Sequence, residues 1–283
     1  MATTVAGSEL PRAIIDGELA TETTIKGPRS VATLPDGGFV VVDNEHHILS
    51  VGRDGRLTEV PTDALREPAA TKITGVVAAP DGRLFIATDE RVYLLDPRAP
   101  DNVGTVAGTD TRGFSGDGDT AIRAQLQVPM GLALSPQVPT GPVASPLSGY
   151  LYIADCENSR VRRIDLASNV IETVAGGGSV NEEGGRANEV GGLSCPLAVA
   201  VGPDSAVYIN AGGDTVRKVD RQRMTTAAGP LSKPAVIEDG QPATETSFSE
   251  IRGIAVDSRN RLYLSEGNRV RRVEEGGRVS TYA

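Results

Sequence analysis

A unit of four short apolar runs, repeated along the chain, limits the possible folds more than any other feature of the sequence. Residues 117–176 hold one copy without interruption, with runs at 131–134, 150–155, 160–165 and 171–176. The runs are rich in Val, Ile, Leu and Tyr and are separated by turn residues, which is typical of antiparallel β-strands. One four-stranded sheet cannot bury both of its faces, so we expect the copies to pack against one another.

The first strand of the unit recurs five times along the chain. The copies are Ser30-Val31-Ala32, Gly75-Val76-Val77, Gly131-Leu132-Ala133, Ala198-Val199-Ala200 and Gly253-Ile254-Ala255. They start 45 to 67 residues apart, a period near that of propeller blades. The sequence therefore predicts an all-β fold, a five-bladed β-propeller of four-stranded antiparallel blades, with residues 1–283 forming a single domain.

An Asp-Gly pair stands 15 positions before the second residue of the first strand in three copies, at Asp16, Asp117 and Asp239. In the fourth copy Gly184-Gly185 stands in that place, and the second copy lacks the element. Because one residue recurs at one offset, we expect these aspartates to hold their loops through backbone N–H groups, without a catalytic role.

Helix signals are nearly absent. The best candidate is a single turn after each Asp-Gly, as in residues 121–126, so we predict less than about 10 % helix. The third copy has an insertion, Pro136 to Ser148, whose four prolines predict an irregular loop.

The third copy also carries a recognisable pattern. Pro129-x-Gly131-Leu132-Ala133 is followed by Leu151-Tyr152-Ile153-Ala154-Asp155, then by Asn158 and Arg160-Val161-Arg162. This pattern, with Phe114 to Gly118, Ala121 and Ala124, resembles NHL-repeat β-propellers, and the resemblance covers essentially the whole chain. It implies a propeller but no single activity, since similar propellers serve as protein-binding modules, RNA-binding surfaces and enzymes.

Six blades are common in that family, so a six-bladed ring is the alternative to five. Thr3 to Gly7 resembles an outer strand, as does Arg278 to Tyr282, and either segment could close the ring.

The chain carries a net charge of −9, which repels phosphate backbones and anionic membranes. We therefore expect neither nucleic acid nor membrane as a partner, but a small molecule or a protein, bound by a monomer. No apolar run approaches the ~20 residues that cross a bilayer. Two cysteines make no disulfide framework, so a cytoplasmic location is expected, or an extracellular one if the domain comes from a longer chain.

Loops before each first strand and between the second and third strands should meet at the mouth of the central channel, where propeller ligand sites usually lie. The residues before the small first-strand residue are Arg29, Thr74, Met130, Leu197 and Arg252. In a closed five-bladed ring, Arg29 and Arg252 are neighbours, and paired guanidinium groups suit a carboxylate or phosphate. Alternatively, each pairs with an acid such as Glu250 or Glu266.

His46 and His47, in the loop of the first copy, are the only histidines and become the candidates for general acid/base catalysis, with Glu45 beside them. Asp155, Asn158 and Asn268 occupy the same loops in other copies and are candidate ligand-binding residues. Their simpler role is structural, because short polar side chains satisfy loop backbone.

No metal site is predicted from these residues. Two adjacent histidines cannot easily turn both rings to one ion, and no third exists. This departs from the amidating lyases among the resembling proteins, which rely on a histidine-bound zinc. No cofactor is expected, with a channel calcium as the alternative. Cys156 and Cys195 fall on the same face, where free thiols are expected and a disulfide is the alternative.

Two functions remain open from the sequence. The first is a small-molecule-acting propeller, a lyase, isomerase or cyclase, whose pocket at the channel mouth takes an anionic or carboxylate-bearing substrate. The second is a protein-interaction module without catalysis. A deep pocket with buried polar groups favours the first, and a broad exposed apolar patch favours the second.

Overall fold

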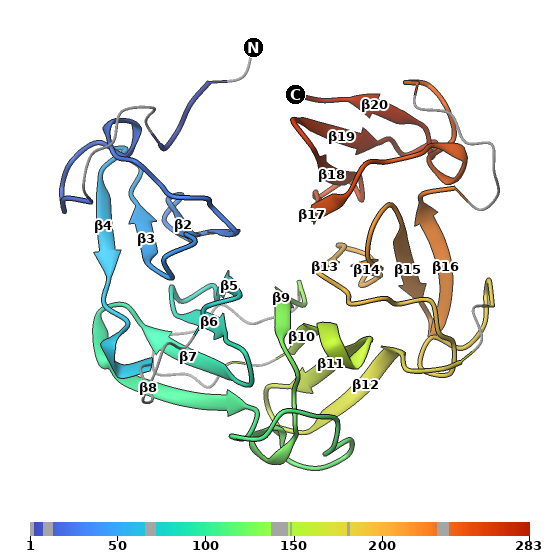
Figure 1. Cartoon of the computed structure of the whole chain (residues 1–283), viewed down its shortest axis with the longest axis horizontal. Helices are drawn as coiled ribbons and strands as arrows, with labels where there is room; N and C mark the ends of the chain where they lie inside the picture. The colour runs from blue at the N-terminus through green and yellow to red at the C-terminus, as the bar shows by residue number, and fades with distance from the viewer. Residues whose placement is uncertain are drawn as a thin grey trace.

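The computed structural model describes residues 3–7, 14–65, 72–136, 147, 149–179, 182–230 and 238–283. Within them, five sheets of four antiparallel strands stand around a common centre as the blades of a propeller (Figure 1). The predicted five-bladed fold is confirmed. No helix in this part of the chain has the length and apolarity needed to span a bilayer.

Each blade is a meander whose strands follow one another outward in sequence order. Blade 1 holds β1 (Ser30–Thr33), β2 (Phe39–Val42), β3 (Ile48–Val51) and β4 (Leu57–Val60). Blade 2 holds β5 (Gly75–Ala78), β6 (Leu84–Ala87), β7 (Val92–Asp96) and β8 (Ala99–Ala107). Blade 3 holds β9 (Pro129–Leu134), β10 (Tyr150–Asp155), β11 (Arg160–Asp165) and β12 (Ile171–Gly176). Blade 4 holds β13 (Val199–Val201), β14 (Val207–Asn210), β15 (Val216–Asp220) and β16 (Arg223–Ala228). Blade 5 holds β17 (Ile251–Val256), β18 (Leu262–Glu266), β19 (Arg269–Val273) and β20 (Val279–Thr281).

The helical content of the described residues is limited to single 3₁₀ turns. They are η1 (Ala20–Glu22), η2 (Asp63–Leu65), η3 (Ala121–Arg123), η4 (Cys156–Asn158) and η5 (Ala243–Glu245). η1, η3 and η5 follow the three Asp-Gly pairs, as predicted. The proline-rich insertion expected at Pro136 to Ser148 lies almost entirely outside the described residues.

An aspartate sets the turn between the first two strands in four blades. Asp36, Asp81, Asp204 and Asp257 each accept a hydrogen bond from the backbone N–H two residues further on, at 2.9 to 3.1 Å. This contact fixes the reversal locally, because the short side chain replaces a backbone acceptor. The sequence therefore sets the blade meander residue by residue.

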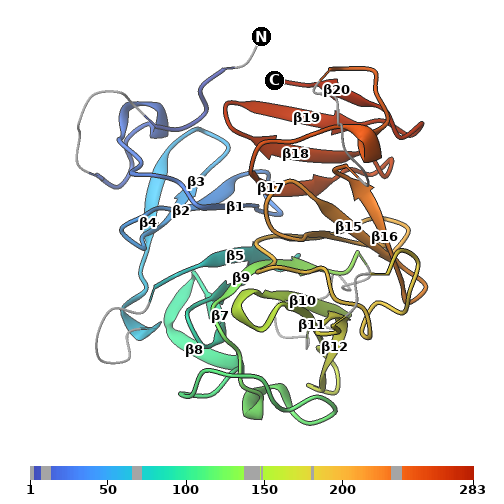
Figure 2. The ribbon, with the colours of Figure 1, turned by 45° about the vertical axis from the view of Figure 1, so that its right-hand side comes forward.

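The hydrophobic core is divided among the spaces between consecutive blades. Separate clusters of buried side chains join blades 1 and 2, 2 and 3, 3 and 4, and 4 and 5. No such cluster among the described residues joins blade 5 to blade 1. The ribbons of these two blades stand apart in the view of Figure 1, whereas they overlap in the turned view of Figure 2. The arc of five blades therefore leaves two sheets with only one neighbouring sheet each.

In blade 3 and again in blade 5, a buried arginine on the third strand links two parts of the same blade. In blade 3, Arg162 binds Asp117 at 2.8 Å and lies 3.7 Å from Asp155, with its side chain fully buried. In blade 5, Arg271 binds Asp239 at 2.8 Å and Glu266 at 3.1 Å. Each guanidinium thus joins the preceding loop to the end of the second strand.

Blade 4 has the same arrangement with a different acid. Arg217 binds Glu183 at 3.0 Å, and the N–H of Gly184 donates to the carbonyl of Met224, as the N–H of Gly118 does to Ile171 in blade 3. Glu183-Gly184 therefore occupies the Asp-Gly place, and the alignment of Gly184-Gly185 with it was wrong. The reason is one extra residue between this loop and β13.

The structural role expected of the repeated aspartates is confirmed for two of them. Asp16 accepts a hydrogen bond from the N–H of Glu59, and Asp239 from that of Thr281, both at 2.8 Å. Asp117 instead makes its contact with Arg162. All three hold a loop against the outer half of their own blade.

Replacing Arg162 by Met should lower the free energy of unfolding by about 3 to 5 kcal/mol, because Asp155 would remain buried without its cation. Urea denaturation followed by circular dichroism measures this loss. Arg123→Met is the control: this side chain is exposed, so its loss should change stability by less than about 0.5 kcal/mol. Equal effects of the two substitutions would contradict the role given to Arg162.

Candidate functional site

Backbone hydrogen bonds connect loops of neighbouring blades at the expected channel mouth. The N–H of Val128, before β9, donates to the carbonyl of Asp89 in the loop of blade 2. The N–H of Ile251, at the start of β17, donates in the same way to Gly213 in blade 4. Backbone hydrogen bonds therefore link a second-to-third-strand loop to the segment leading into the next blade, which fixes the positions of the candidate side chains.

In the histidine loop of blade 1, residues 43–47, a carboxylate holds the imidazole ring of His47 in place. Asp43, buried at the end of β2, accepts hydrogen bonds from the N–H groups of Glu45 and His47 through Oδ1. Its Oδ2 lies 3.1 Å from Nδ1 of His47, whose Nε2 is 4.0 Å from Glu59. A carboxylate that fixes one ring nitrogen leaves the other available for proton transfer. Asp43 is the functional candidate that sequence reasoning missed here, although it belongs to the same repeated loop.

The other two candidates of this loop are engaged elsewhere. Nδ1 of His46 lies 3.4 Å from the carbonyl of Ile73, at the segment leading into blade 2. Glu45 forms an exposed ion pair with Lys26 at 2.7 Å. The structure therefore brings Glu45 close to His47 but turns His46 toward blade 2.

Asp43, Glu45 and His47 place potential ligand atoms within 4.8 Å of one another. The side chains of Asp43 and His47 are held together by their own hydrogen bond, and the carboxylate of Glu45 is paired with Lys26, so each of the three groups already has a protein partner. This grouping therefore gives no support for a metal site in the loop.

The two arginines proposed as an anion site have different surroundings. Nε of Arg29 donates to Oδ1 of Asn44, whereas Arg252 forms an ion pair with Glu250 at 2.6 Å. The pairing of Arg252 with Glu250 confirms the alternative considered for it. No hydrophobic cluster of the described residues joins blades 1 and 5, so no contact of that kind brings Arg29 and Arg252 together.

Of the remaining mouth candidates, Thr74 makes a contact between two blades. The hydroxyl of Thr74 donates to the carbonyl of Pro129 in the next blade. Met130, in β9, and Leu197, before β13, are partly buried, and Asn268 is exposed.

Asp155 is the most perturbed carboxyl group at the mouth. It accepts hydrogen bonds at 2.8 Å from the N–H of Gln127 and from the side chain of Asn158. Burial raises the pKa of Asp155 to about 6, against the lowering effects of these hydrogen bonds and of Arg162. Asn158 also donates to the carbonyl of Gly113 at 2.7 Å, so both predicted ligand-binding residues hold the loop itself.

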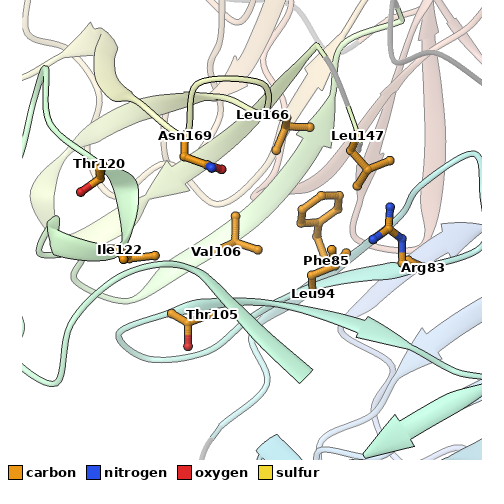
Figure 3. A pocket seen from close by; sticks show the side chains of 10 residues that line it. All are labelled: Arg83, Phe85, Leu94, Thr105, Val106, Thr120, Ile122, Leu147, Leu166 and Asn169. Atoms are coloured by element: carbon orange, nitrogen blue, oxygen red, sulfur yellow. The ribbon is translucent and has the colours of Figure 1, made fainter. Parts of the chain in front are cut away.

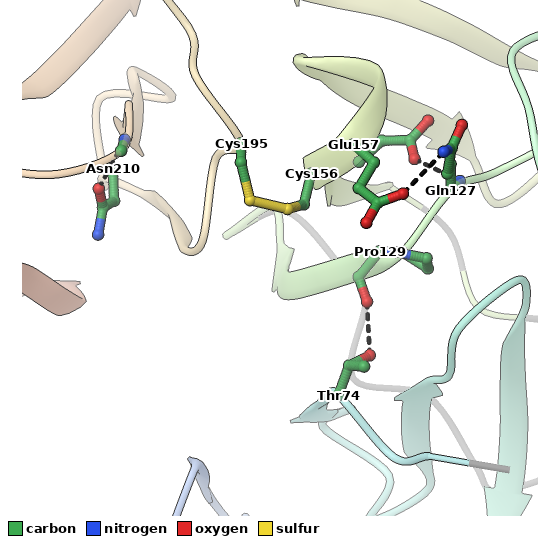
Figure 4. The surroundings of a disulfide bond; sticks show 9 residues. Thr74, Gln127, Pro129, Cys156, Glu157, Cys195 and Asn210 are labelled. Carbon is green, nitrogen blue, oxygen red and sulfur yellow. Dashed lines mark hydrogen bonds between the residues drawn. A yellow bond between two sulfur atoms is a disulfide. The ribbon is translucent and has the colours of Figure 1, made fainter.

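A disulfide joins Cys156, in η4, to Cys195, in the segment leading into blade 4 (Figure 4). The expectation of free thiols was therefore wrong, and the alternative holds. The packing of blade 3 against blade 4 places the two loops side by side, which spacing in sequence did not reveal. Closing a loop of 39 residues between two blades is expected to stabilise them by about 3 to 4 kcal/mol.

A pocket of about 280 Å³ lies away from these residues, between blades 2 and 3 (Figure 3). Its lining is mainly apolar, with Phe85, Leu94, Val106 and Ile122 among the contributing side chains. Arg83 and Asn169 come from turns at the opposite end of the blades from the histidine loop. The pocket therefore contains none of the predicted site residues.

Comparison with known proteins supports the fold. No known family profile matches the chain. The protein SUPPRESSOR OF QUENCHING 1, chloroplastic, of Arabidopsis thaliana is 28% identical over 175 residues, which cover 56% of this chain and 15% of that protein. The chain thus corresponds to a small part of that relative's length.

Among solved structures, an auxiliary nutrient binding protein from Bacteroides ovatus has a TM-score of 0.68 at 12% identity, covering 99% of this chain and 64% of that one. Virginiamycin B lyase from Staphylococcus aureus has a TM-score of 0.54 at 15% identity, covering 91% of this chain and 70% of that one. These neighbours are β-propeller proteins, and they include both an enzyme and a binding protein. At such identities the similarity shows the fold alone.

The protonation of Asp155 predicts a pH effect on stability. Its pKa of about 6 in the folded state lies above the usual 3.8, so the folded protein binds more protons than the unfolded chain between about pH 4 and pH 6. Stability contributed by this group therefore falls as the pH rises through that window. Asp155→Asn should remove this fall, and the variant should gain up to about 3 kcal/mol relative to the wild type between pH 4 and pH 7.

Urea midpoints measured at intervals from pH 4 to pH 7 provide the test. The exposed Asp119→Asn variant is the control and should follow the wild-type profile. Parallel profiles of the wild type and Asp155→Asn would show that Asp155 does not titrate in this range.

Proposed function

We propose that this chain is an NHL-like protein-interaction module that binds a partner polypeptide on the sides of blades 1 and 5 that face each other. The proposal rests on one observation: no neighbouring sheet of the described chain packs on these two sides, and Val31 and Tyr282 are exposed on them. The hydrophobic clusters of the other interfaces bury such surface between neighbouring blades. Exposed apolar surface of this kind marks interaction sites in soluble proteins.

Blade 5 has one packed face and one free face. Leu262, Leu264 and Val273 pack against blade 4, whereas Tyr263 and its cross-strand partner Arg272 point to the other side. We call that side the free face of blade 5; it carries Ala255, Tyr263, Ser265, Val270, Arg272, Ser280 and Tyr282. None of these residues is buried. The ring of Tyr282 contacts that of Tyr263 edge to face at 5.1 Å and remains 59% exposed.

Blade 1 has a matching exposed position on its inner strand. Val40 and Val42 pack against blade 2, so Val31 and its cross-strand partner Val41 lie on the opposite side. Residues from the N-terminal part of the chain cover the outer half of this side, but Val31 remains 66% exposed. The two exposed surfaces thus belong to the two sheets that lack a second neighbour.

The polar candidates at the channel mouth give less support to catalysis. Arg252 and Glu45 are paired with other charged side chains, and Asp155 and Asn158 hold their own loop. The disulfide favours an oxidising location, so we further propose that the chain works there rather than in the cytoplasm.

The double variant Val31→Asp, Tyr282→Ser should bind the partner at least tenfold more weakly, because both side chains lie on the proposed surface. Both are already exposed in the free protein, so their replacement should not affect folding. Immobilised protein is incubated with extract from the producing cells, and retained polypeptides are quantified by mass spectrometry. Ile122→Asp is the matched control, since Ile122 is 53% exposed on another part of the molecule.

The proposal requires that one polypeptide is retained by the wild type and by Ile122→Asp but not by the double variant. Equal retention by all three proteins, or no retained polypeptide at all, would contradict it. Unchanged melting temperatures would show that the substitutions act on binding and not on folding.

A second candidate function is favoured by the Asp43–His47 pair. An imidazole held by a buried carboxylate can act as a general base, and a lyase, isomerase or cyclase acting on an anionic substrate would use it so. His47→Gln should then abolish turnover of any active compound in a panel of carboxylates and lactones, with little change in stability. His46→Gln is the control, and activity that survives in His47→Gln would eliminate this role.

A further inference from the structure

We propose that the pocket between blades 2 and 3 binds a small uncharged apolar molecule that carries a carbonyl oxygen, such as a ketone, an ester or an amide. This site is separate from the protein-binding surface proposed above, because none of its lining residues belongs to blade 1 or blade 5. Three observations carry the inference: a repeated cationic side chain that blade 2 lacks, a guanidinium group with unused donors, and a local balance of charge.

The third strand of blades 2 to 5 has one residue directly opposite an aromatic residue of the second strand. In blades 3, 4 and 5 this residue is a long cation opposite a tyrosine. The pairs are Arg163–Tyr152, Lys218–Tyr208 and Arg272–Tyr263. In blade 2 the pair is Leu94–Phe85, and Gly104 stands beside Leu94 on the outer strand. Blade 2 therefore lacks both the cation and an outer side chain that could cover this part of the sheet.

The cation of blade 3 shows what blade 2 is missing. The guanidinium carbon of Arg163 lies 4.3 Å from the centre of the Tyr150 ring, and Arg163 also forms an ion pair with Glu172 on the outer strand. Leu94 is shorter and uncharged, and a Cβ atom added to Gly104 would meet nothing within 4 Å. Leu94 instead lines the pocket of about 280 Å³, whose size is near the lower end for small-molecule sites.

The side chains that line the pocket form a row with polar groups at its ends (Figure 3). Arg83 lies at one end and Thr120 at the other, and Phe85, Val106 and Ile122 stand between them. Lining of this kind suits a ligand with an apolar body and few polar atoms.

Arg83 has donors that the protein does not use. Its Nε donates to Oδ2 of Asp81 at 2.9 Å, and its Nη2 lies 2.8 Å from the same oxygen but is buried without a hydrogen bond. Arg98, in the turn between β7 and β8, instead donates to both oxygens of Asp96, from Nε at 2.8 Å and from Nη2 at 3.1 Å. Because a buried donor without an acceptor costs free energy, a ligand oxygen beside Arg83 would be stabilised there.

The charges around this end of the pocket are balanced. Arg83 pairs with Asp81, and Arg98 pairs with Asp96. A carboxylate bound to Arg83 would therefore place a second negative charge close to Asp81 without bringing a cation. A carbonyl oxygen accepts the same hydrogen bond without this repulsion, so the site favours an uncharged ligand.

The test compares two small probes with the same number of carbon atoms, methyl hexyl ketone and octanoate. Each is titrated into the full chain, whose Ile, Leu and Val methyl groups are isotopically labelled and followed by NMR. We expect the ketone to shift the methyl signals of Leu94, Val106 and Ile122 in a saturable way, because these side chains line the pocket. Octanoate should bind about tenfold more weakly or less, because it adds an unpaired charge.

Two arginine variants test the polar end of the pocket. Arg83→Met should weaken binding of the ketone about tenfold or more, because a hydrogen bond from a charged donor is lost. Arg98→Met is the matched control: Arg98 has a similar ion pair with an aspartate but does not line the pocket, so this variant should bind the ketone as the wild type does.

A double variant tests the apolar groove. Leu94→Arg, Gly104→Glu copies the ion pair of Arg163 and Glu172 into blade 2 and should abolish binding of the ketone. Its melting temperature shows whether it folds, and the two arginine variants decide the result if it does not.

Four outcomes would overturn the inference. They are methyl signals that the ketone leaves unchanged, octanoate that binds as tightly as the ketone, an Arg83→Met variant that binds the ketone as well as Arg98→Met does, and a folded double variant that still binds it.

Discussion

The packing of each sheet against the next is the interaction on which this structure depends. A four-stranded blade has two apolar faces, and each of the four clusters between blades buries one face of two sheets at once. Removing one sheet would therefore expose two others. The same dependence explains why blades 1 and 5 differ in burial from blades 2 to 4. Tyr263 in blade 5 is half-buried, whereas its counterpart Tyr152 in blade 3 is part of a hydrophobic cluster.

Charge is placed inside this apolar framework at a few fixed points. Arg162 and Arg271 are fully buried, and each is flanked by two carboxylates from different parts of its own blade. Buried ions of this kind tolerate few alternative arrangements, because a displaced partner leaves an unpaired charge in a poor solvent. The loops at the channel mouth are therefore held in position more firmly than their lack of regular structure suggests, and the perturbed pKa of Asp155 follows from the same burial.

Much of the fold could be predicted from the sequence because its determinants are local. Aspartates such as Asp36 and Asp81 fix turns through contacts two residues away, and strand alternation shows in every copy. The errors arose where distant residues meet. The Cys156–Cys195 bond depends on how two whole sheets sit together, which the spacing of the cysteines in the sequence does not encode. Glu183 was missed because it lies one residue further from its inner strand than the repeated aspartates do, and because it is a glutamate and not an aspartate. Its ion pair with Arg217 corresponds to that of Asp117 with Arg162.

The disulfide has a consequence for how such an array comes apart. In the part of the chain that the structure describes, the hydrophobic clusters between blades join blades that follow one another in sequence. Unfolding is therefore expected to begin at blade 1 or blade 5, where a sheet has one such neighbour to lose. Cys156 and Cys195 join the third and fourth blades covalently, near the middle of the arc. Unfolding that starts at blade 1 or at blade 5 therefore reaches the disulfide before all five blades have unfolded. The chain would then release its two ends as separate cooperative units around a central pair of blades that is the last part to unfold.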